Sequence, residues 1–129
     1  MARLNSYAEQ HKSPQGPGDA RPSAIQVVKD QNLDWTGKVI LITGCSPGGL
    51  GAETAKALHW TGADVFITAR DVAKGKQVTD EMLGDGKPGK AEVIEMDLGS
   101  LKSIAAGAKN FLGKSAGKLN VLVNNAGRA

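Results

Sequence analysis

Apolar residues from position 37 onward fall into short runs that alternate with stretches of helical spacing. The runs have the length of strands and are rich in β-branched residues, and they occupy residues 39–43, 64–69, 91–96 and 120–124. Their apolar positions are nearly continuous, which is typical of strands covered on both faces. The alternation therefore predicts βαβ units and a parallel sheet, which is the α/β fold class.

The stretches between these runs predict helices. In the first, Gly51, Ala55 and Leu58 recur at helical spacing, and the small residues at its start allow close packing against the sheet. The second helix is expected over about 71–83 and is less regular. The third is the clearest, because Ser100 is a natural N-cap and the apolar positions after it keep the helical period: Leu101, Ile104, Ala105, Ala108, Phe111 and Leu112.

Residues 1–36 differ in composition from the rest of the chain. Residues 1–23 hold three of the five prolines and a Pro/Gly run at 13–18, with few residues that could build a core. A short apolar patch at 25–28 predicts one amphipathic turn. We therefore expect a flexible N-terminal tail that can hold a short helix, followed by one domain over 37–129.

Composition narrows the class of protein. With 40% hydrophobic and 22% charged residues, the chain has the composition of a soluble globular protein. The basic residues behind the net charge of +3 are spread out, so we expect no nucleic-acid partner. Cys45 is the single cysteine, and no apolar run is long enough to span a membrane, so a cytoplasmic protein is expected. His11 and His59 are isolated in sequence, and no metal site is expected.

A glycine-rich turn follows the first predicted strand. It runs from Gly44 through Ser46, Gly48 and Gly49 to Leu50 and Gly51, where the first helix begins. Glycines let a backbone turn tightly and approach a pyrophosphate, and a helix N-terminus offers N–H groups and partial positive charge. The glycines could instead serve only a tight connection, but ligands bind at this place in open α/β sheets, which favours a dinucleotide site.

Three motifs together resemble a known family. They are the run from Thr43 to Gly51, Asp97-Leu98 after the third strand, and Asn124-Asn125-Ala126-Gly127 after the fourth. In this order, each at a strand's carboxyl end, they are similar to the short-chain dehydrogenase/reductase family, in its retinol-dehydrogenase-like and WW-domain-oxidoreductase-like branch. The resemblance implies a Rossmann-type doubly wound parallel sheet, here truncated after about four strands. It also implies an NADP-dependent oxidoreductase that interconverts alcohols and carbonyls by hydride transfer.

One departure from the family pattern concerns the glycine turn. The family pattern T-G-x-x-x-G-x-G is one residue shorter than the segment from Thr43 to Gly51. Aligned from the helix side, Gly49 and Gly51 take the last two glycine positions, and Pro47 or Gly48 is the extra residue. Which backbone amide meets which phosphate is left open by the sequence.

Arg70 bears on the choice of cofactor. It lies 19 positions beyond Gly51, close to where an NAD-binding protein carries an acidic residue for the ribose. A guanidinium can pair with a 2′-phosphate, whereas a carboxylate repels one. Lys74 and Lys76 follow one helical turn later and add positive potential. NADP(H) is therefore favoured over NAD(H), although Arg70 could be a solvated charge paired with Asp71, or Asp71 itself could bind the ribose.

The resemblance assigns the remaining cofactor contacts. It implies that Asp97 and Leu98 lie beside the adenine, and that Asn124, Ala126 and Gly127 steady the sheet and line the adenine-ribose pocket. From the residues alone, the alternatives are that Asp97 is a turn or capping residue and that the segment after the fourth strand is a plain turn.

The family's catalytic residues have no match here. The resemblance implies a serine and a Tyr-x-x-x-Lys pair, but the one tyrosine, Tyr7, lies in the tail with a histidine four positions on. We therefore expect the cofactor-binding half without catalytic residues, inactive alone, with alcohol or carbonyl substrates bound only in a complete relative. The alternatives are a non-catalytic NADP-binding or partner-binding remnant and a non-functional truncated product. Residues 120–124 would form an exposed hydrophobic edge, which predicts association and marginal stability.

Overall fold

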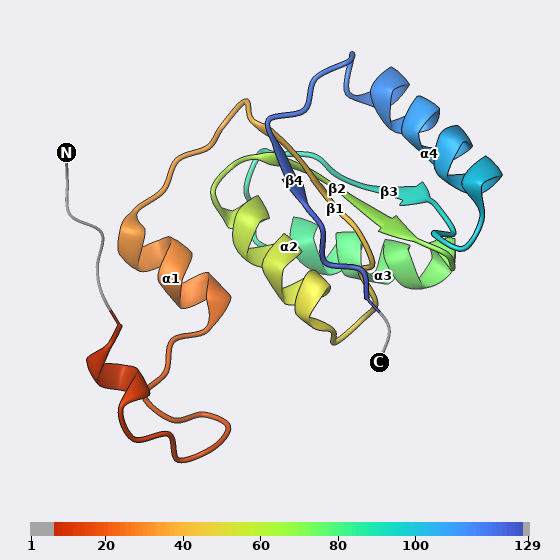
Figure 1. Ribbon diagram of the computed structural model, residues 1–129. Coiled ribbons are helices and arrows are strands. Elements are labelled where there is room, and N and C mark those ends of the chain that lie inside the picture. The colour runs from red at the N-terminus through yellow and green to blue at the C-terminus, as the bar shows by residue number, and fades with distance from the viewer. Residues whose placement is uncertain (1–6, 128–129) are drawn as a thin grey trace.

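A four-stranded parallel sheet forms the centre of the molecule (Figure 1). The computed structural model describes residues 7–127. In space the strand order is β3-β2-β1-β4, and every pair of neighbours is parallel. This confirms the predicted α/β class and doubly wound sheet. The strands are β1 (Val39–Ile42), β2 (Asp64–Ala69), β3 (Ala91–Glu95) and β4 (Val121–Val123).

Helices cover both faces of the sheet. Helices α2 (Leu50–Trp60) and α3 (Val72–Leu83) lie on one face, and α4 (Leu101–Lys114) lies on the other (Figure 1). The core is accordingly split into two clusters, since Ile40 and Ile42 of β1 pack with α2 and α3 while Val39 and Leu41 pack toward the side that holds Phe111. Both sets of β1 side chains are buried, which explains why this run has no polar alternation.

The strands end earlier than the apolar runs suggest. Thr43 and Met96 follow β1 and β3 without belonging to them, although their amides still bond to Val123 and Ala69. Beyond Thr43 the chain turns at Gly44, whose φ is +72°. Asn120 and Asn124 likewise flank β4. Thr43, Met96 and Asn124 begin the loops that carry the candidate site, whereas Asn120 precedes β4.

Helix α4 buries fewer residues than its spacing of apolar positions predicts. Only Gly107 and Phe111 are buried, whereas Leu101 is 87% and Leu112 is 50% exposed. The reason is that α4 packs mainly on β3, and no second helix lies beside it within residues 7–127. A helix buries a wide apolar stripe only where two elements pack against it, and α4 packs mainly against one, β3.

Strand β4 is an edge of this sheet. It pairs with β1 on one side, and Leu122 is 49% exposed. The association through this edge that the sequence predicts has not been tested and stays a prediction.

The segment before the sheet contains a short 3-10 helix, η1 (Glu9–His11), and helix α1 (Ala24–Gln31). Ser23 caps α1 by accepting a hydrogen bond from the Gln26 amide, and Val28 is buried beside α2. The short helix expected near residues 25–28 is therefore present. Within residues 7–127 no helix is long and apolar enough to cross a membrane.

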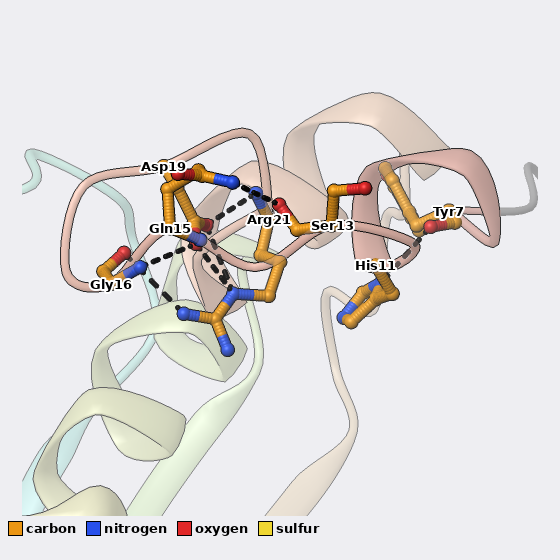
Figure 2. A network of polar contacts seen from close by, with 7 residues as sticks. All are labelled: Tyr7, His11, Ser13, Gln15, Gly16, Asp19 and Arg21. Carbon is orange, nitrogen blue, oxygen red and sulfur yellow. Dashed lines mark hydrogen bonds and ion pairs between the residues drawn. The ribbon is translucent and has the colours of Figure 1, made fainter.

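The Pro/Gly run before α1 is organised by one carboxylate (Figure 2). Asp19 accepts hydrogen bonds from the amides of Gln15, Gly16 and Arg21 and from the Arg21 side chain. These bonds, that of the Arg21 side chain above all, hold the pKa of Asp19 well below its usual value. Local hydrogen bonding thus gives shape to a stretch without a hydrophobic core.

Candidate functional site

A cleft of about 850 Å³ lies at the carboxyl edge of the sheet, where the loops after all four strands meet. This volume falls within the usual range of small-molecule and cofactor pockets. The cleft is lined by Gly44, Cys45, Ser46, Thr68, Ala69, Arg70, Asp71, Lys74, Met96, Asp97, Leu98, Gly99, Ala126 and Gly127.

The floor of the cleft is the turn at Gly44. A Cβ added there would lie 2.6 Å from the Cα of Ala126, and the positive φ independently favours glycine. The Gly44 amide donates to the Thr68 hydroxyl at 3.1 Å. The Thr43 hydroxyl accepts from the amides of Asn125 and Ala126, both at 3.2 Å. The loops that follow β1 and β4 are therefore fixed to one another, and the loop after β1 is also fixed to strand β2.

A tight turn takes up the extra residue of the glycine-rich segment. The Gly49 amide donates to the Ser46 carbonyl at 3.0 Å, and Gly48 has a φ of +75°. Proline at the second position and positive φ at the third are the features of a type II β-turn. The turn over Ser46–Gly49 thus accommodates both Pro47 and Gly48, which the sequence could not decide between, and Ser46 still lines the cleft.

Helix α2 begins directly after this turn. Gly49 is its N-cap and supplies no side-chain hydrogen bond. Within residues 7–127, the amides of Leu50, Gly51 and Ala52 have no hydrogen-bond partner, whereas the Glu53 amide bonds to Gly49. These amides are the donors that a helix N-terminus leaves for an anion.

Arg70 and Asp71 have different tasks. The Asp71 carboxylate caps α3 by accepting from the amides of Ala73 and Lys74, at 3.0 and 3.3 Å. Arg70 lines the cleft and forms no ion pair with any residue in the range 7–127. The structure therefore shows no pairing of Arg70 with Asp71. Lys74 also lines the cleft, whereas Lys76 lies on the outer surface of α3.

Asp97 forms a turn at the cleft wall. Its Oδ1 accepts from the Gly99 amide at 2.9 Å, and its backbone carbonyl accepts from Ser100. The other oxygen, Oδ2, has no partner within the described part of the chain. Asp97 is thus a turn residue that keeps one carboxylate oxygen available beside Leu98 and Met96.

Two cleft residues carried no clear signal in the sequence. Thr68, 1% exposed, reads as part of an apolar strand, yet its hydroxyl and carbonyl bond to the Gly44 and Cys45 amides. Cys45 is 2% exposed, and burial raises the pKa of its thiol to about 11. A thiol in this state is a poor nucleophile at neutral pH. The one sequence signal for Thr68 was its position, because a polar residue there directly precedes the last residue of a buried strand.

The structure brings together most of the residues singled out in the sequence. The cleft lining includes Gly44, Ser46, Arg70, Asp97, Leu98, Ala126 and Gly127. The other five lie outside the lining: Gly48 and Gly49 in the type II turn, Leu50 and Gly51 in the first turn of α2, and Asn124 after β4. Leu50 is 83% exposed, and Gly51 packs against the side chain of Asn125.

Residues 38–129 match the family model described as short chain dehydrogenase. The chain belongs to this family. It is 51% identical to oxidoreductase calI of Penicillium decumbens over 131 residues, which cover 96% of this chain and 37% of that protein. It is 43% identical to human retinol dehydrogenase 12 over 96 residues, which cover 74% of this chain and 30% of that protein. The family resemblance predicted from the three motifs is confirmed.

Solved structures agree with this assignment. A metagenomic short-chain oxidoreductase in complex with NADP is 43% identical, with a TM-score of 0.65 over 72% of this chain and 40% of that chain. Hydroxysteroid dehydrogenase from Escherichia coli is 34% identical, with a TM-score of 0.66 over 75% of this chain and 40% of that chain. The chain thus spans well under half the length of the relatives it matches.

Proposed function

We propose that this chain is the NADP(H)-binding half of an oxidoreductase that interconverts an alcohol and a carbonyl. The observation that carries the proposal is the cleft in which Gly44, Ser46, Arg70 and Asp97 meet at the carboxyl edge of the sheet. The relatives include proteins named as oxidoreductases and dehydrogenases, and one solved relative is in complex with NADP. The bound nicotinamide would supply the hydride chemistry.

The glycine turn and α2 would hold the pyrophosphate. The amides of Leu50, Gly51 and Ala52 are the unpaired donors at the start of α2, and Ser46 adds a hydroxyl on the cleft side. The Gly49 amide is already used by the type II turn. We therefore assign the pyrophosphate to donors from Leu50 onward together with Ser46.

Arg70 would select the 2′-phosphate of NADP(H). It lines the cleft without an ion-pair partner among the described residues, and Lys74 lies beside the same cleft. The neighbouring carboxylate that could have bound a ribose hydroxyl, Asp71, is engaged as the cap of α3. Two cations and an occupied carboxylate favour NADP(H) over NAD(H).

The adenine would lie between the loops after β3 and β4. Asp97 has an available Oδ2 that can accept a hydrogen bond from the adenine amine, and Leu98 and Met96 supply apolar surface. Ala126 and Gly127 leave space on the opposite wall. No tyrosine or histidine lines this described cleft, so we propose that the chain binds cofactor without turning over substrate.

Titration with NADPH and NADH tests this proposal. We expect nicotinamide fluorescence to report tighter binding of NADPH, and Arg70→Glu to remove the preference, a change of about tenfold or more, because a charged contact to phosphate becomes a repulsion. Lys109→Glu on exposed α4 makes the same change of charge away from the cleft and should keep the preference. Equal affinity for both cofactors in the wild type would contradict the role of Arg70.

A further inference from the structure

A second cavity, of about 380 Å³, lies at the opposite edge of the sheet. It is formed where α1 and α2 end and where the loop between α3 and β3 passes them. Trp60, the last residue of α2, lines it together with Lys29 of α1 and Lys87 of the loop. None of its lining residues belongs to the nucleotide cleft.

Two ammonium groups converge on one indole ring in this cavity. Lys29 Nζ lies 4.2 Å and Lys87 Nζ 4.3 Å from the centroid of the Trp60 ring. The two nitrogens therefore lie no further than 8.5 Å apart, the sum of these distances. Each cation is attracted by the ring, but the two repel each other at this separation.

One carboxylate, that of Asp34, lies near the two lysines and offsets only part of their charge. Within residues 7–127 neither lysine forms an ion pair with a carboxylate. Asp34 also lines the cavity, but its Oδ1 accepts from both the amide and the hydroxyl of Thr36, at 3.0 and 2.7 Å. The pKa of Asp34 is lowered mainly by these Thr36 hydrogen bonds, and Lys87 adds a smaller electrostatic contribution.

The carbonyls at the end of α2 are also engaged. Leu58 accepts from the amide and hydroxyl of Thr61, and His59 accepts from the Gly62 amide. The negative end of the helix dipole is thereby partly satisfied by the chain itself. The partial negative charge that remains at the end of α2 accounts for one lysine there. It does not account for two lysines on the same ring.

Lys87 is held in place by a buried network. The Asp85 carboxylate accepts from the Lys87 amide at 2.7 Å, and its second oxygen lies 2.7 Å from Nδ1 of His59. Nε2 of His59 lies 2.7 Å from the carbonyl oxygen of Gly89, and the imidazole is fully buried. The loop is thus wrapped around His59, which fixes the backbone that presents Lys87 to Trp60.

The opposite wall comes from the segment before the family domain. Lys29 precedes residue 38, where the family match begins. The fungal relatives from Penicillium match 94–98% of this chain, whereas human retinol dehydrogenase 12 matches 74%. One wall of the cavity therefore belongs to the family domain, and the other belongs to the segment before it, which the Penicillium proteins also match.

We propose that this cavity binds a small oxyanion with two negative charges, such as phosphate, between Lys29 and Lys87. Such an anion relieves the repulsion between the ammonium groups and forms a charge-assisted hydrogen bond with each. Trp60 forms the part of the cavity wall that both ammonium groups contact. The proposal does not rest on the NADP(H) assignment, because the two sites share no residue.

Titration of the full chain with inorganic phosphate at constant ionic strength tests the proposal. The chain has two tryptophans, Trp35 and Trp60, so nuclear magnetic resonance of the indole N–H groups can follow each of them. We expect the Trp60 signal to shift saturably and the Trp35 signal to change little. Lys29→Gln and Lys87→Gln should each weaken phosphate binding by about tenfold, because each removes one of two charged contacts.

Matched variants separate this site from general charge effects. Lys109→Gln removes one lysine from α4 and should leave the Trp60 response unchanged, and Arg70→Glu should abolish any phosphate bound in the nucleotide cleft but not this response. No saturable shift of Trp60, or a shift that survives in both Lys29→Gln and Lys87→Gln, would overturn the proposal. An equal response to chloride would overturn it as well.

A membrane headgroup could present the same phosphate chemistry, and a second arm distinguishes this source. Vesicles containing phosphatidic acid should sediment the wild type and Lys29→Gln to the same extent if the site takes a free anion. Sedimentation that depends on both lysines, with no response to free phosphate, would contradict the small-anion site.

Discussion

The two edges of the sheet use hydrogen bonds in different ways. At the carboxyl edge the loops leave donors and charges unpaired within the described chain, among them the first amides of α2 and the Arg70 guanidinium. At the amino edge the buried polar groups are paired with each other, as in the contacts of His59 with Asp85 and Gly89. Lys29 and Lys87 in the smaller cavity are the exception there, since neither forms an ion pair within the described residues. The difference indicates that the carboxyl edge is built mainly to receive a ligand, and that the buried network at the amino edge holds the fold together.

The largest expected effect is at the amino edge. Gly89→Ala should lower the free energy of unfolding by about 3 kcal/mol, because a Cβ there would overlap the backbone carbonyl of Ala63. Chemical denaturation measures the change. Gly113→Ala in α4 is the matched control, since nothing lies within 4 Å of its added Cβ, and alanine should stabilise the helix slightly. Equal stability of the two variants would show that the amino edge is not tightly packed.

The next effect concerns the buried histidine. His59→Ala should cost about 2–3 kcal/mol of unfolding free energy, because it leaves Asp85 and the Gly89 carbonyl without their partner and opens a cavity. His11→Ala is the control, since that ring is exposed. If the two edges have separate roles, the folded fraction of His59→Ala keeps the NADPH preference of the wild type.

At the carboxyl edge, two glycines allow a direct comparison. Gly44→Ala combines an unfavourable positive φ with a clash against Ala126, whereas Gly48→Ala has a similar φ and open space. We expect Gly44→Ala to abolish NADPH binding and Gly48→Ala to cost about 1 kcal/mol of stability with binding weakened only modestly. Fluorescence titration and denaturation of both variants check this. The same loss of binding in each would mean that backbone strain, and not the contact with Ala126, sets the shape of the cleft.

The smallest expected effect is at the start of α4, next to the cleft. Ser100→Ala should lower stability by about 1 kcal/mol, because the Ser100 hydroxyl accepts from the Ser103 amide and caps α4. Thermal unfolding measures this change. Because Asp97 keeps its own bond to the Gly99 amide, NADPH affinity should change little. A large loss of affinity would show that the start of α4 belongs to the binding site.

The elements that could be predicted from the sequence are those that depend on residues close together in the chain. The apolar runs predict all four strands, and the glycine turn after β1 predicts where the candidate cleft lies, because periodicity and turn residues act over a few positions. The bonds of His59 could not be predicted, since its partners lie 26 and 30 residues away. The exposure of Leu112 could not be predicted either, because it depends on which elements pack beside α4.

Hydrogen exchange of the backbone amides with and without saturating NADPH tests the central claim, that the carboxyl edge is the cofactor site. The account predicts added protection in the loops after the four strands, at residues 44–52, 70–74, 97–99 and 124–127, and little change at residues 85–90 on the amino edge. Unchanged exchange at 44–52, or protection centred on 85–90, would contradict it.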